Sequence, residues 1–121
     1  MATIMLVDDD DQVRMLSKID LEDAGYRFVS ADSGKHALRL LQHREVEVDL
    51  ILVDIIMPDM DGLELIPVLR KTRPATKIIA ITAGSGEMNY LDVAKHFGAH
   101  DTLKKPFTRQ ALLDAVASQL K

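Results

Sequence analysis

The sequence of 121 residues contains no cysteine and no tryptophan, and aromatic residues make up only 4% of it. The absence of cysteine excludes a disulfide framework, a thiolate zinc site and a cysteine nucleophile. So small an aromatic content argues against a surface on which nucleic-acid bases stack. No apolar run reaches the ~20 residues that a transmembrane helix needs, and the first residues lack the basic and apolar segments of a signal peptide. We therefore expect a soluble, cytoplasmic domain that contacts no membrane.

The chain also has little positive charge for its number of acids, and its formal net charge is −4 at pH 7. Domains that bind DNA or RNA are usually basic, so we expect no direct contact with nucleic acid. A hydrophobic content of 47% is enough for a core, and this length is common for one domain. We expect one domain over residues 1–121, with no output domain in this chain.

Short apolar runs alternate with helical patterns five times along the chain. Continuous apolar runs are typical of strands buried on both faces, and parallel strands need a crossover such as a helix between them. The pattern predicts an α/β fold, a doubly wound five-stranded parallel sheet with helices on both faces. The predicted strands cover residues 1–7, 26–31, 48–53, 77–81 and 101–104, and the predicted helices cover about 10–24, 33–41, 63–69, 87–97 and 108–120.

Individual residues predict where helices begin and end. Ser33 and Thr108 are suited to cap the second and fifth helices, and Gly25 is suited to end the first. Pro67 stands near the middle of the third helix, where we expect it to kink or shorten that helix.

Polar residues stand at the carboxyl ends of four predicted strands. Asp8 and Asp9 follow the first strand, Asp54 the third, Thr82 the fourth and Lys105 the fifth. Each residue alone is unremarkable, because acids after strands often cap helices, but this fold brings all four strand ends to one edge. Three adjacent carboxylates would raise one another's pKa unless a divalent cation is present. Oxygen ligands without cysteine or paired histidine suit Mg²⁺, so the sequence predicts a Mg²⁺ site beside Asp54.

The same group of residues predicts a site for a phosphoryl group. Asp54 is the central candidate nucleophile, and carboxylates do form aspartyl phosphates. Lys105 can pair with an anion, and Thr82 can hydrogen-bond to one.

Four motifs carry a family resemblance: MLVDDDD at 5–11, LVDIIMPDMDG at 52–62, IAITAG at 79–84 and KKPF at 104–107. With them the chain resembles a receiver domain of the two-component response-regulator family, and in particular the single-receiver chemotaxis regulators, over essentially its whole length. The resemblance implies the flavodoxin-like strand order 2-1-3-4-5 and a phosphorylation-controlled switch in signal transduction. It also implies a phosphoprotein that catalyses only its own phosphorylation and dephosphorylation and is otherwise not an enzyme.

The resemblance further implies a role for each residue of the site. Asp54 would accept a phosphoryl group from a phosphohistidine of a histidine kinase or histidine phosphotransfer protein. Asp8, Asp9, Asp54 and the backbone carbonyl of Ile56 would hold Mg²⁺, while Lys105 would contact the phosphoryl oxygens.

The resemblance implies that phosphorylation moves Thr82, with the backbone N–H of Ala83 also reaching the phosphate and the bond before Pro106 being cis. Family members usually carry an aromatic residue where this chain has Thr102, so we expect the output to depend more on displacement of the loop of residues 83–87 and of its helix. The usual output surface, and the expected surface for an unknown downstream protein, is formed by the fourth helix, fifth strand and fifth helix. The residues expected to act as the switch or its hinges are Thr82, Gly84, Gly86, Thr102 and Pro106.

Three other interpretations make different demands on the sequence. A flavin or nucleotide carrier would need a phosphate-binding loop after the first strand, where this chain has aspartates. A Mg²⁺-dependent phosphohydrolase would need a second acid at Ile56. The chain could equally be the N-terminal receiver of a larger response regulator, or part of a hybrid kinase, with a DNA-binding or enzymatic output domain.

Two histidines and two basic residues carry weaker signals. His96 and His100 have the spacing of a metal pair on a helix, but Gly98 between them is expected to end that helix. Arg14 and Lys18 lie just beyond the predicted site, either as ordinary surface charges or as contacts to the phosphodonor protein.

Overall fold

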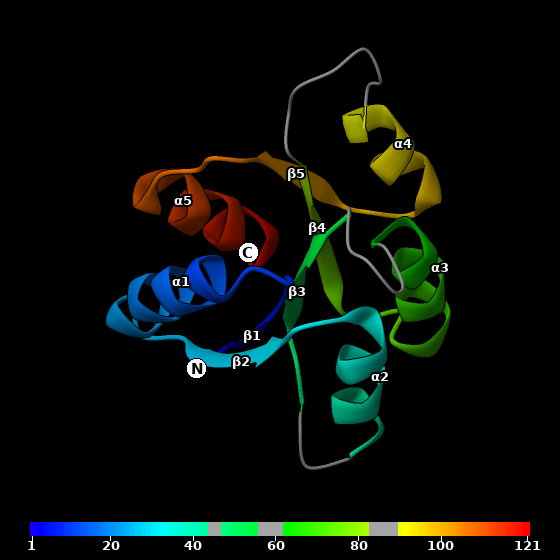
Figure 1. The fold of residues 1–121 in the computed structure, drawn as a ribbon, viewed down its shortest axis with the longest axis horizontal. Helices are drawn as coiled ribbons and strands as arrows, with labels where there is room; N and C mark the ends of the chain where they lie inside the picture. Colours follow the sequence, from blue (N-terminus) through cyan, green and yellow to red (C-terminus); the bar gives the residue numbers. More distant parts are fainter. Residues whose placement is uncertain (44–46, 56–61, 83–89) are drawn as a thin grey trace.

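The protein is described here by a computed structural model, which covers residues 1–43, 47–55, 62–82 and 90–121 (Figure 1). Strands and helices alternate along the chain, and all four strand pairings are parallel. The strand order is β2-β1-β3-β4-β5, which confirms the predicted fold class and order. The strands are β1 (Thr3–Val7), β2 (Arg27–Ala31), β3 (Leu50–Asp54), β4 (Lys77–Thr82) and β5 (Asp101–Lys104). The helices are α1 (Asp11–Asp23), α2 (Gly34–Gln42), α3 (Gly62–Thr72), α4 (Tyr90–Phe97) and α5 (Arg109–Gln119).

Helices cover both faces of the sheet, with α1 and α5 on one face and α2, α3 and α4 on the other (Figure 1). Successive residues of a strand point to opposite faces, so alternate residues of β1 enter different cores. Met5 and Val7 pack in the cluster that includes residues of α2 and α3. Ile4 and Leu6 pack with residues of α1 and α5. Because the central strands are buried on both sides, only their ends can carry polar chemistry.

The helix termini follow the signals expected from the sequence. The Ser33 hydroxyl accepts a hydrogen bond from the His36 N–H, and the Thr108 hydroxyl accepts one from the Ala111 N–H, so both predicted caps are confirmed. Gly25, with a φ of 97°, follows the end of α1, as expected of a residue in the left-handed region.

One expectation about a helix was wrong. Pro67 does not shorten α3, which runs through it to Thr72. Because Pro67 has no N–H, the Leu63 carbonyl lacks its helical hydrogen-bond donor. The proline ring is exposed, so the energetic cost of this lost hydrogen bond falls at the surface of the helix. The predicted first helix is confirmed as α1, in which Leu21 is buried while Leu16 and Ile19 are about half exposed.

Gly62 brings the start of α3 directly against the end of β3. Its N–H donates to the Ile55 carbonyl at 3.1 Å. A Cβ at this position would lie 2.5 Å from the Asp54 carbonyl oxygen and 2.5 Å from the Ile55 Cα. Both neighbours are backbone atoms of a buried strand end, so they cannot yield cheaply, and only glycine fits.

We predict that Gly62→Ala lowers the free energy of unfolding by about 1–3 kcal/mol, the usual cost of forcing an extra carbon into a packed site. Urea denaturation followed by far-ultraviolet circular dichroism measures this. Lys35→Ala, at an exposed position in the first turn of α2, is the control and should change stability little. A Gly62→Ala protein as stable as the wild type would show that the two backbone segments can separate freely.

Candidate functional site

The carboxyl edge of the sheet brings together the polar residues that end its strands. Asp8 follows β1, while Asp54 and Thr82 are the last residues of β3 and β4. Carboxylate oxygens of Asp8, Asp9 and Asp54 all lie within 4.8 Å of one another. Asp8 is fully buried, Asp54 is 6% exposed and Asp9 is exposed. The acid cluster predicted from the sequence is therefore present at this edge.

Lys105 brings a positive charge into the acid cluster. Its ammonium nitrogen lies 2.9 Å from Asp54 Oδ2, to which it donates a hydrogen bond. It also lies 2.8 Å from Asp8 Oδ2. That second contact is an ion pair between the ammonium group and a buried carboxylate oxygen. One cation thus bridges two carboxylates that come from different strands.

The Asp8 segment is held in place by local hydrogen bonds. The Asp8 N–H donates to the Ala31 carbonyl on β2 at 3.1 Å. Asp8 Oδ1 accepts from the Asp10 N–H at 2.9 Å. The Arg14 guanidinium donates to the Asp8 carbonyl and also pairs with Asp11. Arg14, which the sequence left open between a surface charge and a partner contact, is therefore a structural contact to the acid loop.

Asp10 connects this loop to α1. Its carboxylate accepts hydrogen bonds from the N–H groups of Gln12 and Val13, so it caps the helix. The four acids at residues 8–11 therefore have different roles. Asp8 and Asp9 lie at the site, Asp10 caps α1, and Asp11 pairs with Arg14.

The pKa values of both Asp8 and Lys105 are raised, for different reasons. Burial raises the pKa of Asp8, and the charge of Asp54 adds to this rise, while Lys105 and the Asp10 N–H oppose it. Burial would lower the pKa of Lys105, but the two carboxylates outweigh burial and raise that pKa. Lys105 therefore stays charged, and burial disfavours the ionised form of Asp8.

The donor set fits a hard divalent cation. Three carboxylates supply oxygen atoms, and no nitrogen or sulfur ligand stands among them. Such a set is typical of Mg²⁺, which keeps open positions for water or phosphate oxygens. A cation here would also offset the unfavourable charge of Asp8. The fourth expected ligand, the Ile56 carbonyl, lies outside the described residues.

Thr82 lies at the same edge and is tied to Lys105 through the backbone. The Lys105 N–H donates to the Thr82 carbonyl at 2.6 Å. The Thr82 hydroxyl oxygen is buried and has no hydrogen-bond partner within the part of the chain that the structure describes. A buried hydroxyl without a partner carries a cost that a nearby acceptor would remove.

The remaining predicted residues are placed only in part. The Lys105–Pro106 peptide bond is cis, as the resemblance implied. Thr102 is half-buried in β5. Ala83, Gly84 and Gly86 lie outside the described residues, so the predicted roles of the loop after β4 stay predictions.

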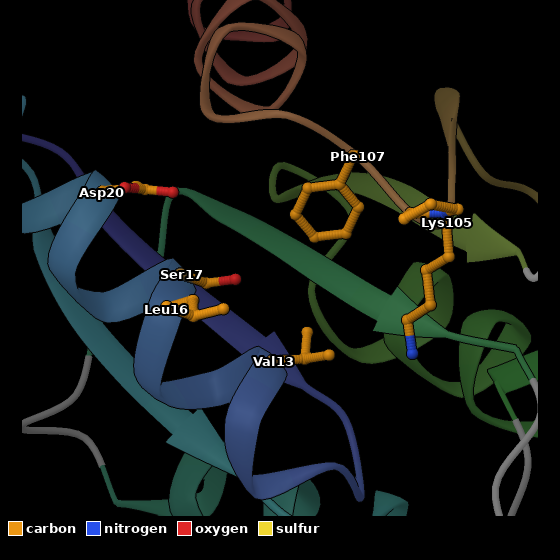
Figure 2. Close-up of a pocket in the computed structure, with 7 residues that line it drawn as sticks. Val13, Leu16, Ser17, Asp20, Lys105 and Phe107 are labelled. Atoms are coloured by element: carbon orange, nitrogen blue, oxygen red, sulfur yellow. The ribbon is translucent and has the colours of Figure 1, made fainter.

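One feature was missed at the level of sequence, an apolar pocket of about 480 Å³ beside the site. It lies between α1 and the segment that follows β5, and Figure 2 shows Val13, Leu16 and Ser17 on one side with Lys105 and Phe107 on the other. At the far end of α1, the Arg109 guanidinium of α5 donates to Asp23 at 3.1 Å, which ties the two helices together. The sequence carries no signal for this pocket, because it depends on how α1 lies against the segment that follows β5.

Comparisons with known proteins identify the family. A model of the response regulator receiver domain matches residues 4–117. The chain belongs to the response regulator receiver domain family, which confirms the resemblance seen in the motifs. It is a receiver domain of two-component signalling.

The chain is similar to parts of larger curated proteins. It is 37% identical to the sensor kinase CckA of Brucella abortus, over 99% of this chain and 13% of that protein. It is 35% identical to the transcriptional regulatory protein CpxR of Escherichia coli, over 100% of this chain and 50% of that protein. The chain thus spans half or less of these relatives.

Solved structures support the same family assignment. The chemotaxis protein CheY4 of Vibrio cholerae has a TM-score of 0.88 and 31% identity, covering 98% of both chains. The response regulator TrrA of Thermotoga maritima, solved in complex with Mg²⁺ and BeF, has a TM-score of 0.85 and 31% identity, covering 98% of this chain and 99% of that one. Among the described helices of the present chain, none has the length and apolar character needed to cross a membrane.

The raised pKa of Asp8 predicts how stability depends on this residue. The unfolded chain ionises Asp8 at lower pH than the folded protein does, so the ionised carboxylate disfavours folding at neutral pH. We predict that Asp8→Asn raises the free energy of unfolding by about 0.5–2 kcal/mol at pH 7 without Mg²⁺. The gain should shrink as the pH falls toward the ordinary aspartate value of 3.8.

Urea denaturation at a series of pH values measures this dependence. Glu22→Gln, an exposed acid on α1, is the control and should show no such gain. An Asp8→Asn protein that is less stable than the wild type at pH 7 would mean that the contact with Lys105 outweighs the burial of the charge.

Proposed function

We propose that Asp54 is the phosphoacceptor of this receiver domain and takes a phosphoryl group from a phosphohistidine of a histidine kinase or histidine phosphotransfer protein. The observation that supports this best is the Lys105 ammonium, which contacts Asp8 and Asp54 at 2.8 and 2.9 Å at the edge where Thr82 presents a hydroxyl. Asp54 is the carboxylate that lies between the other acid and these two groups in strand order.

In the proposed reaction an Asp54 carboxylate oxygen attacks phosphorus and forms an acyl phosphate bond. The phosphorus–nitrogen bond of the donor breaks, and its electron pair returns to the imidazole of the donor. Lys105 exchanges part of its contact with Asp54 for the transferred phosphoryl oxygens. Because the β3 backbone is buried up to Asp54, the nucleophile is held still throughout.

We further propose that Asp8, Asp9, Asp54 and the Ile56 carbonyl hold Mg²⁺. When bound, the ion neutralises the carboxylates and the phosphoryl oxygens. Asp8 would keep its charge more readily in that state, since the cation opposes the effect of burial. The fit rests on the three carboxylates and on the excess of negative charge over Lys105.

Phosphorylation would then act as a switch through Thr82. A phosphoryl group adds roughly −1.5 to −2 charge and three acceptor oxygens, and the Thr82 hydroxyl would gain the partner that it lacks among the described residues. Its movement would displace the segment after β4, with Ala83 contributing its N–H. An unknown downstream protein would recognise the resulting change on the α4–β5–α5 face. Phosphorylation would thereby shift an existing equilibrium between two positions of the segment after β4.

We propose that the protein is a cytoplasmic signalling switch and not a turnover enzyme. It would catalyse only its own phosphorylation and dephosphorylation. CpxR and CckA are longer proteins, and the segment similar to this chain makes up only part of each. By analogy, an output domain on the same polypeptide is the alternative to a receiver that acts alone by protein contact.

We predict that the wild type incubated with Mg²⁺ and acetyl phosphate gains one phosphoryl group by intact mass, and that Asp54→Asn gains none. Amides do not form the acyl phosphate, so the variant removes the nucleophile and little volume. Chelation of Mg²⁺ should suppress the reaction of the wild type. Phosphorylation of the Asp54→Asn protein to the wild-type extent would assign the acceptor to another residue.

We also propose that the phosphodonor docks on the exposed apolar residues of α1. Met15, Leu16 and Ile19 are each at least half exposed, and Leu16 lines the pocket that reaches Lys105. Burying such side chains is the main source of affinity in protein interfaces. The surface thus lies beside the residues that would receive the phosphoryl group.

We predict that Leu16→Glu slows transfer from a histidine phosphotransfer protein that phosphorylates the wild type by about tenfold or more, as loss of a central interface contact does. Phosphorylation by acetyl phosphate, which needs no docking, should keep its rate. Lys35→Ala is the control on the opposite side of the sheet. If Leu16→Glu slowed both reactions equally, the substitution would be acting on the site and not on docking.

A further inference from the structure

A second site is suggested by the contacts of His100, at the amino edge of the sheet and far from the acid cluster. The His100 N–H donates to the Ile78 carbonyl at 2.8 Å. The Ile78 N–H donates in turn to the imidazole Nδ1 at 3.0 Å. The ring therefore continues the β4–β5 ladder by one step, and its orientation is determined by the backbone of β4.

The other ring nitrogen faces a second donor. The Arg70 guanidinium of α3 lies with Nη1 2.8 Å from His100 Nε2. A neutral imidazole has one N–H and one acceptor nitrogen, and arginine can only donate. Because Nδ1 accepts from Ile78, the proton of the neutral ring sits on Nε2, so two N–H donors point at each other.

Arg70 is directed to this place by the turn between α4 and β5. A Cβ at Gly98 would lie 2.8 Å from Arg70 Cγ, so the aliphatic part of the arginine lies against this glycine. Gly98 has a φ of 118°, which a residue with a side chain rarely adopts. The guanidinium is nevertheless exposed, and the long side chain can retreat to admit an acceptor.

The surroundings of the pair are positive. Burial and the charges of Arg70 and Lys77 lower the pKa of His100, in that order. Arg70 and Lys71 also lie in the last turn of α3, and Lys95 and His96 lie in that of α4. Asp101 follows His100 in the chain, and its carboxylate accepts a hydrogen bond from the Thr102 N–H.

We propose that Arg70 and His100 Nε2–H form a binding site for one anionic oxygen group, a carboxylate or a phosphate. An oxygen placed between the two donors accepts from both, which replaces a donor-to-donor contact with two charge-assisted hydrogen bonds. Lys77 adds attraction at longer range. The ligand would connect α3 to the β4–β5 ladder, and it requires neither Mg²⁺ nor phosphorylation of Asp54.

The test is a nuclear magnetic resonance titration of the unphosphorylated chain with inorganic phosphate at pH 7, without Mg²⁺ and at an ionic strength held constant with chloride. The Ile78 amide and the His100 ring should shift together and saturate in the millimolar range. Arg70→Gln should weaken the binding by at least about fivefold, the loss expected for an exposed charge-assisted contact. Arg39→Gln, an exposed arginine in the last turn of α2, should bind as the wild type does.

A second variant separates this role from a purely structural one. His100→Asp supplies the acceptor within the chain, since one oxygen can accept from Ile78 and the other can face Arg70. It should raise the thermal midpoint and abolish the phosphate-induced shifts. Absence of a saturable shift, equal binding by Arg70→Gln, or a destabilised His100→Asp protein would each overturn the proposal.

A parallel titration with tetraglutamate distinguishes the source of the anion. Binding at least about tenfold tighter than that of phosphate, or 1.4 kcal/mol, would assign the site to an acidic protein segment. Tighter binding of phosphate would assign it to a free or small-molecule phosphate.

Discussion

The contact of one lysine with two buried-strand carboxylates is the interaction on which the site depends. Lys105 reaches Asp8 and Asp54 because β1 and β3 are adjacent parallel strands whose ends lie at the same level. The two acids would repel each other without it, and burial makes that repulsion stronger than in water. The lysine reduces this cost without removing it, as the raised pKa of Asp8 indicates. The edge therefore keeps an excess of negative charge that favours binding a cation.

Much of this arrangement could be predicted from the sequence, because parallel topology acts on whole strands. Once five apolar runs are separated by helices, their carboxyl ends must share an edge, and the residues after them must meet there. Asp8, Asp54, Thr82 and Lys105 were placed correctly on this basis alone. The capping roles of Ser33 and Thr108 could be predicted for a similar reason, since they depend only on neighbours within one turn.

What could not be predicted depends on distances between segments far apart in the chain. Gly62 reads as an ordinary turn glycine, and its closeness to the Asp54 carbonyl appears only when α3 is packed on β3. The exposed apolar face of α1 could not be predicted, because helical periodicity indicates a helix without showing which of its residues are buried. Pro67 misled for a related reason, since the cost of a proline depends on whether the carbonyl that it leaves unpaired can reach solvent.

The two edges of the sheet are linked through β4 and β5, which carry functional groups at both ends. At one end the Thr82 carbonyl accepts from the Lys105 N–H, and at the other Ile78 pairs with His100 through backbone and ring. The paired segment is short, since β4 and β5 match from Ile79 with Asp101 to Thr82 with Lys104. In the proposed switch, a displacement of Thr82 along β4 would strain this short ladder. Two hydrogen bonds between Ile78 and His100 hold the opposite end of β4, which favours a proposed movement localised at the carboxyl edge.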